Sequence, residues 1–302
     1  MNVKCPYCGN IVSSDFKFCD KCGVPVDDTF EYVTGKEFNS IAEANVYSDR
    51  TIKEPLSKSM IKFGIIFALY LLIIPFIIGF AYGIASAIMP SVVPPVSELN
   101  DAQYILANMI LGEISNLIII AIVIGVSIKN ERIKEIFGPR KATKGKMLLN
   151  TIVQGAITFG FMLAATYIIG IISLIFPASD EANANQALIE TFIHSYPVMA
   201  FISVSIMAPI VEELVFRFLL CKPIEQKHPW LGIIISGIVF GAIHLVASAQ
   251  EGTLIQDLPS LVSYVGMGLV FGYRYKMTDN VASNMLAHSI HNTISFIVIL
   301  FV

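Results

Sequence analysis

The chain has 302 residues, of which 55% are hydrophobic and 14% are charged, whereas an average soluble domain is roughly 25% charged. This composition argues against a water-soluble globule, and a net charge of −3 without a broad basic surface argues against nucleic-acid binding. We therefore expect an all-α polytopic protein with about seven to eight transmembrane helices in a lipid bilayer, behind a small N-terminal cysteine-rich module.

Four of the five cysteines form two C-x-x-C pairs near the N-terminus, Cys5 with Cys8 and Cys19 with Cys22. Two such pairs at short range are typical of tetrahedral Zn–S₄ ligation, and a pair of disulfides is the alternative. The orientation argued below puts this end in the reducing cytosol, which favours zinc. We predict a zinc ribbon at residues 1–26 that folds on a structural zinc ion and can dock a protein partner.

Residues 27–58 are polar and acidic, and we interpret them as a cytosolic linker. Most of the apolar segments that follow reach the ~20 residues that a helix needs to cross the hydrocarbon layer, although the sixth is short and the fourth contains charges. The first two belong to an N-terminal transmembrane part at residues 59–144. The segments lie near residues 60–89, 104–128, 147–176, 196–220, 230–249, 259–273 and 280–302.

Proline and glycine predict local features of these helices. Pro75 is expected to kink the first span, because proline lacks a backbone N–H and crowds the preceding turn. Glycines four residues apart permit close helix packing, at Gly79 and Gly83 in the first span and at Gly268 and Gly272 in the sixth.

The loops alternate in charge along the chain. Lys and Arg precede the first span and follow the second, fourth and sixth, whereas the intervening loops are acidic or neutral. Basic loops stay in the cytosol, so we predict an integral protein of a cell membrane with a cytosolic N-terminus and Val302 outside.

Polar side chains occur inside three spans, where each charge near the bilayer centre costs about 2.5–3.5 kcal/mol. Glu213 and Arg217 are four residues apart and should form an internal ion pair. Glu212 points about 100° away from Glu213 and can face another helix. The remaining polar residues of interest are His244 in the fifth span and His288 with Asn292 on one face of the last.

A carboxylate, two imidazoles and a carboxamide suit hydrolysis. A Glu can take a proton from water, a His can hold that water or protonate a leaving amine, and a further His and Asn can donate to an oxyanion. From the depths of Glu212 and His288 in their spans, we expect the water-accessible cavity to open toward the cytosolic half of the membrane.

Three motifs carry a family resemblance: Glu-Glu-x-x-x-Arg at 212–217, Phe-x-x-x-His at 240–244 and His-x-x-x-Asn at 288–292. In this order on successive spans they resemble the CPBP (Abi, or CAAX protease and bacteriocin-processing) intramembrane proteases, which include the type II CAAX prenyl endopeptidase Rce1. The resemblance covers residues 145–302 and implies that this part is a catalytic transmembrane core.

The resemblance also implies roles for individual residues. Glu212 would be the water-activating base, assisted by His244, while His288 and Asn292 would form the oxyanion hole. The implied structural supports are Glu213 and Arg217. The family is often labelled metalloprotease, but the chain lacks the H-E-x-x-H helix of soluble zinc proteases. We favour a metal-free, glutamate-type endopeptidase.

The expected substrate is a membrane-associated or lipid-anchored peptide or protein. The added zinc ribbon favours a prokaryotic membrane, and bacteria generally lack CAAX prenylation. We therefore expect peptide maturation or bacteriocin self-immunity rather than the processing of prenylated CAAX proteins. One alternative is a non-catalytic scaffold that regulates a signalling partner. Another is a small transporter, in which Pro209 would break a helix beside an ion site.

Further polar residues have roles that the sequence leaves open. Asn108, Glu113 and Asn116 in the second span could line the cavity or bond neighbouring helices. His291 lies off the face of His288 and Asn292, and we interpret it as a plain polar contact.

Overall fold

The computed structural model describes residues 2–5, 10–13, 19, 31–32, 55–129, 136, 144–175 and 183–301. Within these ranges, six helical stretches are long and apolar enough to cross a membrane, and the chain is an integral membrane protein. They are Leu56–Ile88, Asp101–Lys129, Leu148–Ile171, Pro197–Glu225, Pro229–Glu251 and Val281–Phe301.

The predicted span at 259–273 is a helix, α13 (Ser260–Thr278), but it is not among these six. Its glycines, serines and tyrosines make it less apolar than the other spans. The helix packs against α10 (Pro229–Ile243), α5 (Lys144–Ile175) and α14 (Val281–Phe301), so little of it needs to face lipid.

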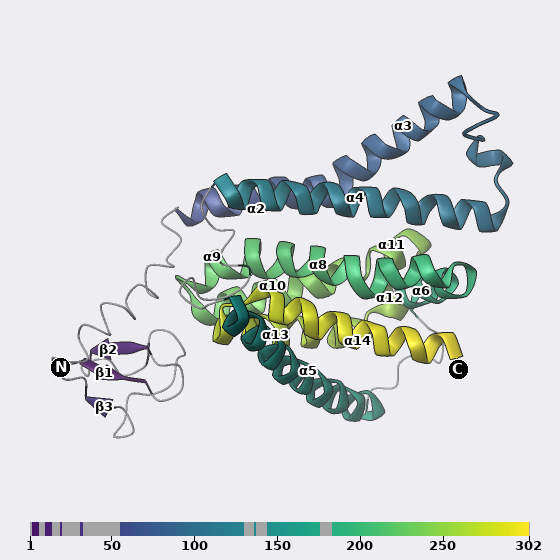
Figure 1. Cartoon of the computed structure of the whole chain (residues 1–302). Coiled ribbons are helices and arrows are strands. Elements are labelled where there is room, and N and C mark those ends of the chain that lie inside the picture. Colours follow the sequence, from purple (N-terminus) through teal and green to yellow (C-terminus); the bar gives the residue numbers. More distant parts are fainter. Residues whose placement is uncertain are drawn as a thin grey trace.

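The first span bends where it was expected to bend. Helix α2 (Leu56–Ala68) passes through a π-helical turn, η1 (Leu69–Ile73), into α3 (Ile74–Ile88), and Pro75 lies in the first turn of α3. Figure 1 shows α3 leaving the line of α2 at this point. After a short 3₁₀ turn, η2 (Val96–Glu98), helix α4 (Asp101–Lys129) runs back in contact with α3 and η1.

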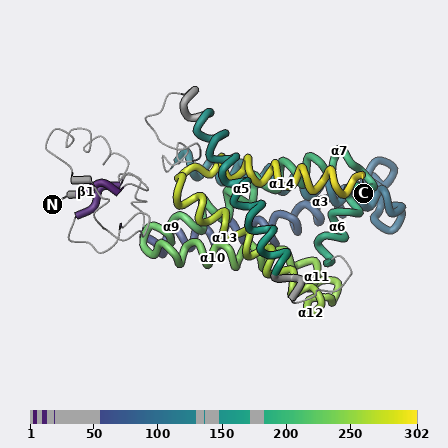
Figure 2. The backbone as a smooth tube through the Cα atoms, turned by 90° about the horizontal axis from the view of Figure 1, so that it is seen from below, coloured from purple at the N-terminus to yellow at the C-terminus, as the bar shows by residue number. Residues whose placement is uncertain are grey.

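The remaining helices form the main bundle, in which α5 crosses the faces of α13 and α14 (Figure 2). The fourth span changes helix type several times, and three short helices cap one end of the bundle. The elements not yet given are α6 (Ala184–Ser195), α7 (Pro197–Ala200), η4 (Phe201–Met207), α8 (Ala208–Glu212), η5 (Glu213–Cys221), α9 (Lys222–Glu225), α11 (Val246–Glu251) and α12 (Leu254–Asp257).

Helices α10 and α13 make the most extensive contact between two helices in the described bundle. A Cβ atom on Gly268 would lie 2.8 Å from the Cα of Gly237, so the two backbones touch where neither residue has a side chain. The predicted close packing at Gly268 is therefore confirmed. The same prediction for Gly79 and Gly83 is wrong, because a Cβ on either would meet nothing within 4 Å.

The two ends of the bundle differ in charge (Figure 1). We call the end where α2 begins and α13 meets α14 the basic end, and the end that carries α6, α11, α12 and the C-terminus the acidic end. Apart from Arg217, every Lys and Arg in the described membrane part lies at or near the basic end. The acidic end carries Glu98, Asp101, Glu190, Glu251 and Asp257.

The N-terminal module contains a three-stranded antiparallel sheet in the order β2-β1-β3. The strands are β1 (Asn2–Lys4), β2 (Ile11–Ser13) and β3 (Glu31–Tyr32), so the sheet includes residues beyond the predicted boundary at 26. Cys5 and Cys19, one from each C-x-x-C pair, are buried in one cluster with Val3 and Val12. Cys8 and Cys22 lie outside the described residues.

Candidate active site

Glu212 ends a single α-helical turn that lies between two π-helical segments, η4 and η5. Pro209 is the second residue after η4, and Pro223 is the second residue after η5. A proline ring crowds the carbonyl four residues earlier, and a widened i→i+5 turn relieves that contact. The prediction that Pro209 breaks the helix is wrong in detail, because the span continues through it in altered register.

The widened turn leaves one carbonyl without its backbone donor. The N–H of Ala208 bonds to the carbonyl of Ser203, five residues back, so the next carbonyl, Val204, would pair with residue 209. Pro209 has no N–H. Asn292 of α14 supplies the missing donor, with its Nδ2 2.9 Å from the Val204 oxygen. This bond ties the last helix to the π segment and leaves the second amide hydrogen of Asn292 available.

The predicted ion pair between Glu213 and Arg217 is confirmed. Arg217 Nε lies 3.4 Å from Glu213 Oε2, and both side chains are fully buried. The Arg217 guanidinium also lies 4.4 Å from the ring centroid of Phe240 and 5.0 Å from that of Phe271. Its Nη2 donates to the carbonyl of Gly268 at 3.3 Å, at the crossing of α10 and α13. The arginine is thus part of the packing core.

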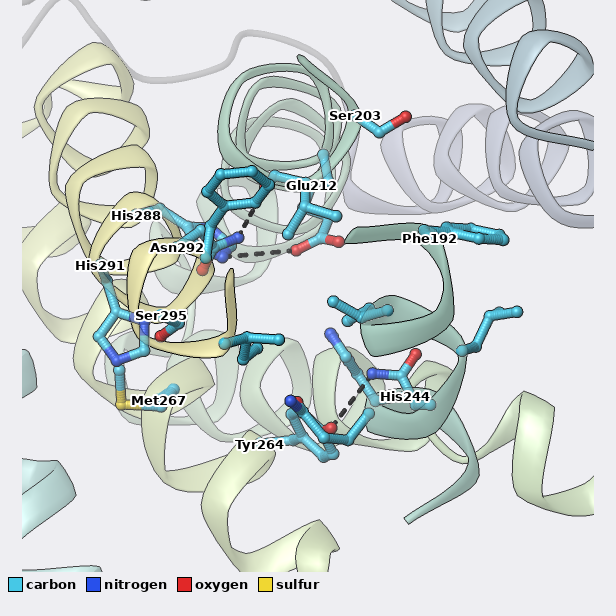
Figure 3. A pocket seen from close by; sticks show the side chains of 18 of the residues that line it. Phe192, Ser203, Glu212, His244, Tyr264, Met267, His288, His291, Asn292 and Ser295 are labelled. Atoms are coloured by element: carbon cyan, nitrogen blue, oxygen red, sulfur yellow. Dashed lines mark hydrogen bonds and ion pairs between the residues drawn. The ribbon is translucent and has the colours of Figure 1, made fainter. Parts of the chain in front are cut away.

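His288 stands between the two adjacent glutamates. Its Nδ1 is 3.4 Å from Glu213 Oε1, and its Nε2 is 3.8 Å from Glu212 Oε2 (Figure 3). Asn284, one turn earlier on α14, donates to Glu213 Oε2 at 3.2 Å. A chain of contacts therefore runs from Arg217 through Glu213 and His288 to Glu212, and it fixes the His288 ring against the wall of a cavity.

His244 lies across that cavity from Glu212. Its Nδ1 is 2.8 Å from the carbonyl of Phe240, so Nδ1 carries the hydrogen and Nε2 is left as an acceptor. The ring stacks on Tyr264 with centroids 4.3 Å apart. Figure 3 shows Glu212 with His288 on one side, and His244 with Tyr264 on the other. The two sides leave room between Glu212 and His244 for a small molecule such as water.

The cavity has a volume of about 650 Å³ and is lined by Glu212, His244, His288 and Asn292, all four predicted catalytic residues. It extends from Glu212 toward the acidic end, where α6 and Ile299 line it. With the orientation predicted from the loops, this direction is outward. The predicted orientation and the expected opening toward the cytosolic half are therefore not compatible with each other.

Several lining residues were missed or left open by the sequence. Asn108, Glu113 and Asn116 all line the cavity, and so does His291. Tyr264 has no sequence signal, because it lies in the least apolar span. Asn284 does have one: Asn284, His288 and Asn292 recur every four residues and mark one polar face of α14.

Metal-ligating side chains do not converge within the part of the chain that the structure describes. No group of three or more His, Cys, Asp or Glu side chains there is arranged to hold a metal ion. Of the predicted zinc ligands, Cys5 and Cys19 belong to this part of the chain, whereas Cys8 and Cys22 fall outside the described ranges.

The part of the chain that carries the three motifs is similar to a known family. Residues 194–294 match the family model described as Type II CAAX prenyl endopeptidase Rce1-like. The matched range contains all seven residues of the three motifs. No solved structure gives a significant match.

A curated protein is also similar to this chain. It is named "Putative membrane peptidase YdiL", from Bacillus subtilis (strain 168), and is 30% identical over 127 residues. The alignment covers 42% of this chain and 46% of that protein, so the chain spans less than half the length of the curated relative it matches.

Proposed function

We propose that this chain is an intramembrane endopeptidase that hydrolyses a peptide bond with water activated by Glu212. The observation that carries the proposal is the placement of the Glu212 carboxylate on a cavity wall, beside an imidazole that the buried Glu213–Arg217 pair holds in position. The similarity of residues 194–294 to the Rce1-like family, and of the chain to a membrane peptidase, supports the same class of activity.

The proposed reaction uses the two sides of the cavity together. A water molecule between Glu212 and His244 Nε2 loses a proton to Glu212, and its oxygen attacks the carbonyl carbon of the scissile bond. The C–N bond then breaks, and Glu212 returns the proton to the leaving amine. Both side chains are needed, since one takes the proton and the other orients the water.

The developing oxyanion needs donors on the opposite side of the carbonyl. His288 lines the cavity and can donate from its Nε2, which lies 3.8 Å from Glu212 Oε2. The second amide hydrogen of Asn292 is the other donor, since the first is bonded to Val204. Fixed donors in a site with little water stabilise such charge strongly.

The charge distribution supports a specific orientation and route of entry. Lys and Arg gather at the basic end, which we assign to the cytosol of a prokaryotic cell, with the N-terminus inside and the C-terminus outside. The cavity extends toward the acidic end. The substrate that we propose is therefore a membrane-associated or lipid-anchored peptide, such as a bacteriocin, that is reached from the outer face.

Labelling of intact cells with a membrane-impermeant maleimide tests this orientation. Ser263 is exposed and lines the cavity, and Lys227 is exposed at the basic end. Ser263→Cys should be labelled from outside, whereas Lys227→Cys should react only after the cells are opened. The reverse pattern would contradict the proposed orientation. If neither cysteine reacts until the cells are opened, the proposed route of entry from the outer face is contradicted.

Structural zinc at the N-terminal module is a separate proposal, with Cys5, Cys8, Cys19 and Cys22 as ligands. The burial of Cys5 and Cys19 in one cluster fits two of the four positions. Four thiolates would complete a tetrahedral site and leave no position for chemistry, which suits a docking module. Purified protein should contain zinc, and Cys8→Ser should lose it without loss of the membrane helices.

Comparison of peptide ends in host membranes tests the enzymatic proposal. Membranes with matched amounts of wild type, Glu212→Gln, His244→Gln and the exposed control Glu251→Gln should be analysed for new protein termini. We expect new ends with wild type and Glu251→Gln, and none with the two site variants. Identical ends in all four, with a partner that co-purifies through residues 1–59, would favour the scaffold alternative.

A further inference from the structure

Glu113 of α4 brings a carboxylate to the cavity that no step of the proposed hydrolysis uses. It lies outside the range that matches the Rce1-like family. The hydroxyl of Ser203 on η4 donates to Glu113 Oε1, and Asn116 Nδ2 lies 3.5 Å from the same oxygen. The other oxygen, Oε2, is buried and accepts no hydrogen bond from any described residue.

A helix-bonding role explains only half of this arrangement. The Ser203 hydroxyl connects α4 to η4 and fixes the carboxylate through Oε1. It leaves Oε2 unsatisfied, and a buried acceptor without a donor destabilises the fold, more strongly if it is charged. A donor from outside the chain would remove that destabilisation.

The surroundings of Glu113 favour a cationic donor. The described lining of the cavity contains two carboxylates, Glu113 and Glu212, and no Lys or Arg. Among the described Lys and Arg side chains, Arg217 alone lies in the middle of the bundle, and it is already paired with Glu213. The acidic residues at the nearby bundle end, including Asp101 and Glu190, extend the negative potential toward the region from which the cavity is reached.

We propose that Glu113 is a specificity-determining residue that binds a cationic group of the substrate, an ammonium or a guanidinium. This inference rests on the proposed protease function, because it assumes a peptide in the cavity. Ser203 holds Oε1 and aims the carboxylate, while Oε2 pairs with the cation. A lysine or arginine side chain, or the free N-terminus of a peptide, offers this chemistry, and neutral or acidic peptides are disfavoured.

Peptide binding tests the proposal without depending on cleavage. Full-length Glu212→Gln protein in lipid nanodiscs is titrated with fluorescein-labelled octapeptides in which one position is varied between lysine and N-acetyl-lysine, with a free or acetylated N-terminus. Fluorescence anisotropy gives the dissociation constants, and the same peptides are offered to wild type to measure cleavage. The comparison is repeated with Glu113→Gln, and with Glu251→Gln as a matched loss of one acidic charge at an exposed site.

We expect the cationic peptides to bind at least about tenfold more tightly than their acetylated counterparts, as a desolvated charge pair predicts. Glu113→Gln should abolish this preference, whereas Glu251→Gln should retain it. If acetylation of the lysine weakens binding, the lysine side chain is the group that Glu113 binds. If acetylation of the N-terminus weakens binding, the terminal amine is that group.

Other outcomes overturn the inference. Equal binding of cationic and acetylated peptides, binding of none of them, or an unchanged preference in Glu113→Gln would each show that the Glu113 charge is not used. A cationic preference that depends on Glu113, with no cleavage by wild type in any membrane, would leave the inference standing and count against the proposed hydrolysis.

Discussion

The α2–α4 hairpin and the bundle that contains α10 and α13 are both apolar, but they are held in different ways. Only 11% of the most apolar stretch of Leu56–Ile88 is buried, against 44% for Pro229–Glu251. In the hairpin, a Cβ atom added to Gly64, Gly79 or Gly83 would have no neighbour within 4 Å. In the bundle, a Cβ atom added to Gly237, Gly241 or Gly268 would collide with the adjacent helix.

Lipid explains the contrast. Hydrocarbon tails solvate an apolar helix as well as another helix does, so apolar surface alone does not draw membrane helices together. Close backbone contact and buried polar pairs do, and both are concentrated around Arg217. The hairpin is therefore specified mainly by its match to the bilayer, and the bundle by particular side chains.

Loss of the buried arginine should have the largest effect on the bundle. Arg217→Met leaves Glu213 buried without its partner, which we expect to destabilise the fold by about 3–5 kcal/mol. Lys58→Met, at an exposed site on α2, should change stability little. Urea or SDS unfolding in mixed micelles measures both. Adding Glu213→Gln to Arg217→Met should recover part of the loss, and no recovery would mean that the arginine acts only through packing.

The glycines test the same contrast with a single methyl group. Gly268→Ala would place Cβ 2.8 Å from the Gly237 Cα, so α10 and α13 must move apart, at an expected cost of about 1–3 kcal/mol. Gly79→Ala meets open space, and its better helix propensity should make it neutral or stabilising by up to about 1 kcal/mol. Thermal unfolding of Gly268→Ala and Gly79→Ala, each compared with wild type, measures the two changes in stability. Equal losses of stability would show that the hairpin is as tightly packed as the bundle.

The bond from Asn292 to Val204 can be measured by a double-mutant cycle. Asn292→Ala removes the donor, whereas Pro209→Ala supplies a backbone N–H at the position that the Val204 carbonyl lacks. The cost of Asn292→Ala should therefore be smaller in the Pro209→Ala background, by about 1 kcal/mol. Strict additivity of the two changes would argue that Val204 is satisfied in another way.

The smallest expected effect is local and depends on pH. The neighbouring Ser248 hydroxyl, the Thr253 hydroxyl at 2.7 Å and the Ala184 N–H at 3.1 Å lower the pKa of the Asp257 carboxyl. The contact that ties α12 to the start of α6 should thus be complete above the ordinary Asp pKa of about 3.9, and weaken as the pH falls below it.

Hydrogen exchange of the amides at the start of α6 measures this weakening, with rates expressed relative to an unfolded chain at each pH. Protection of Ala184 should fall between pH 5 and pH 3 in wild type. In Asp257→Asn it should be lower at pH 5 and change less over the same interval. A parallel fall in both proteins would point to a different titrating group.

Much of this organisation could be predicted from the sequence. All seven apolar segments are helices in the expected places, and the four-residue spacing of Glu213 with Arg217 correctly predicted their ion pair. These features depend on local periodicity and on the cost of burying charge, which a single chain displays directly.

Features that depend on contacts between helices could not be predicted in this way. Tyr264 stacks on His244 only because α10 and α13 cross at their glycines, and G-x-x-x-G spacing does not distinguish that crossing from lipid-exposed Gly79. The direction of the cavity follows from the packing of α4 and α6 around it, whereas the depth of Glu212 alone suggested the opposite side.

The π-helical turns around Glu212 change which residues share a face of the fourth span. On an α-helical wheel, adjacent Glu212 and Glu213 diverge by about 100°. In a π-helical turn, residues five apart lie on the same face of the helix. The α-helical spacing therefore no longer predicts which residues share a face between residues 201 and 221. Both carboxylates thereby reach the single imidazole of His288. A deletion of one residue within 201–207 that restored an α-helical register would rotate one half of the span against the other and separate the acid from its histidine.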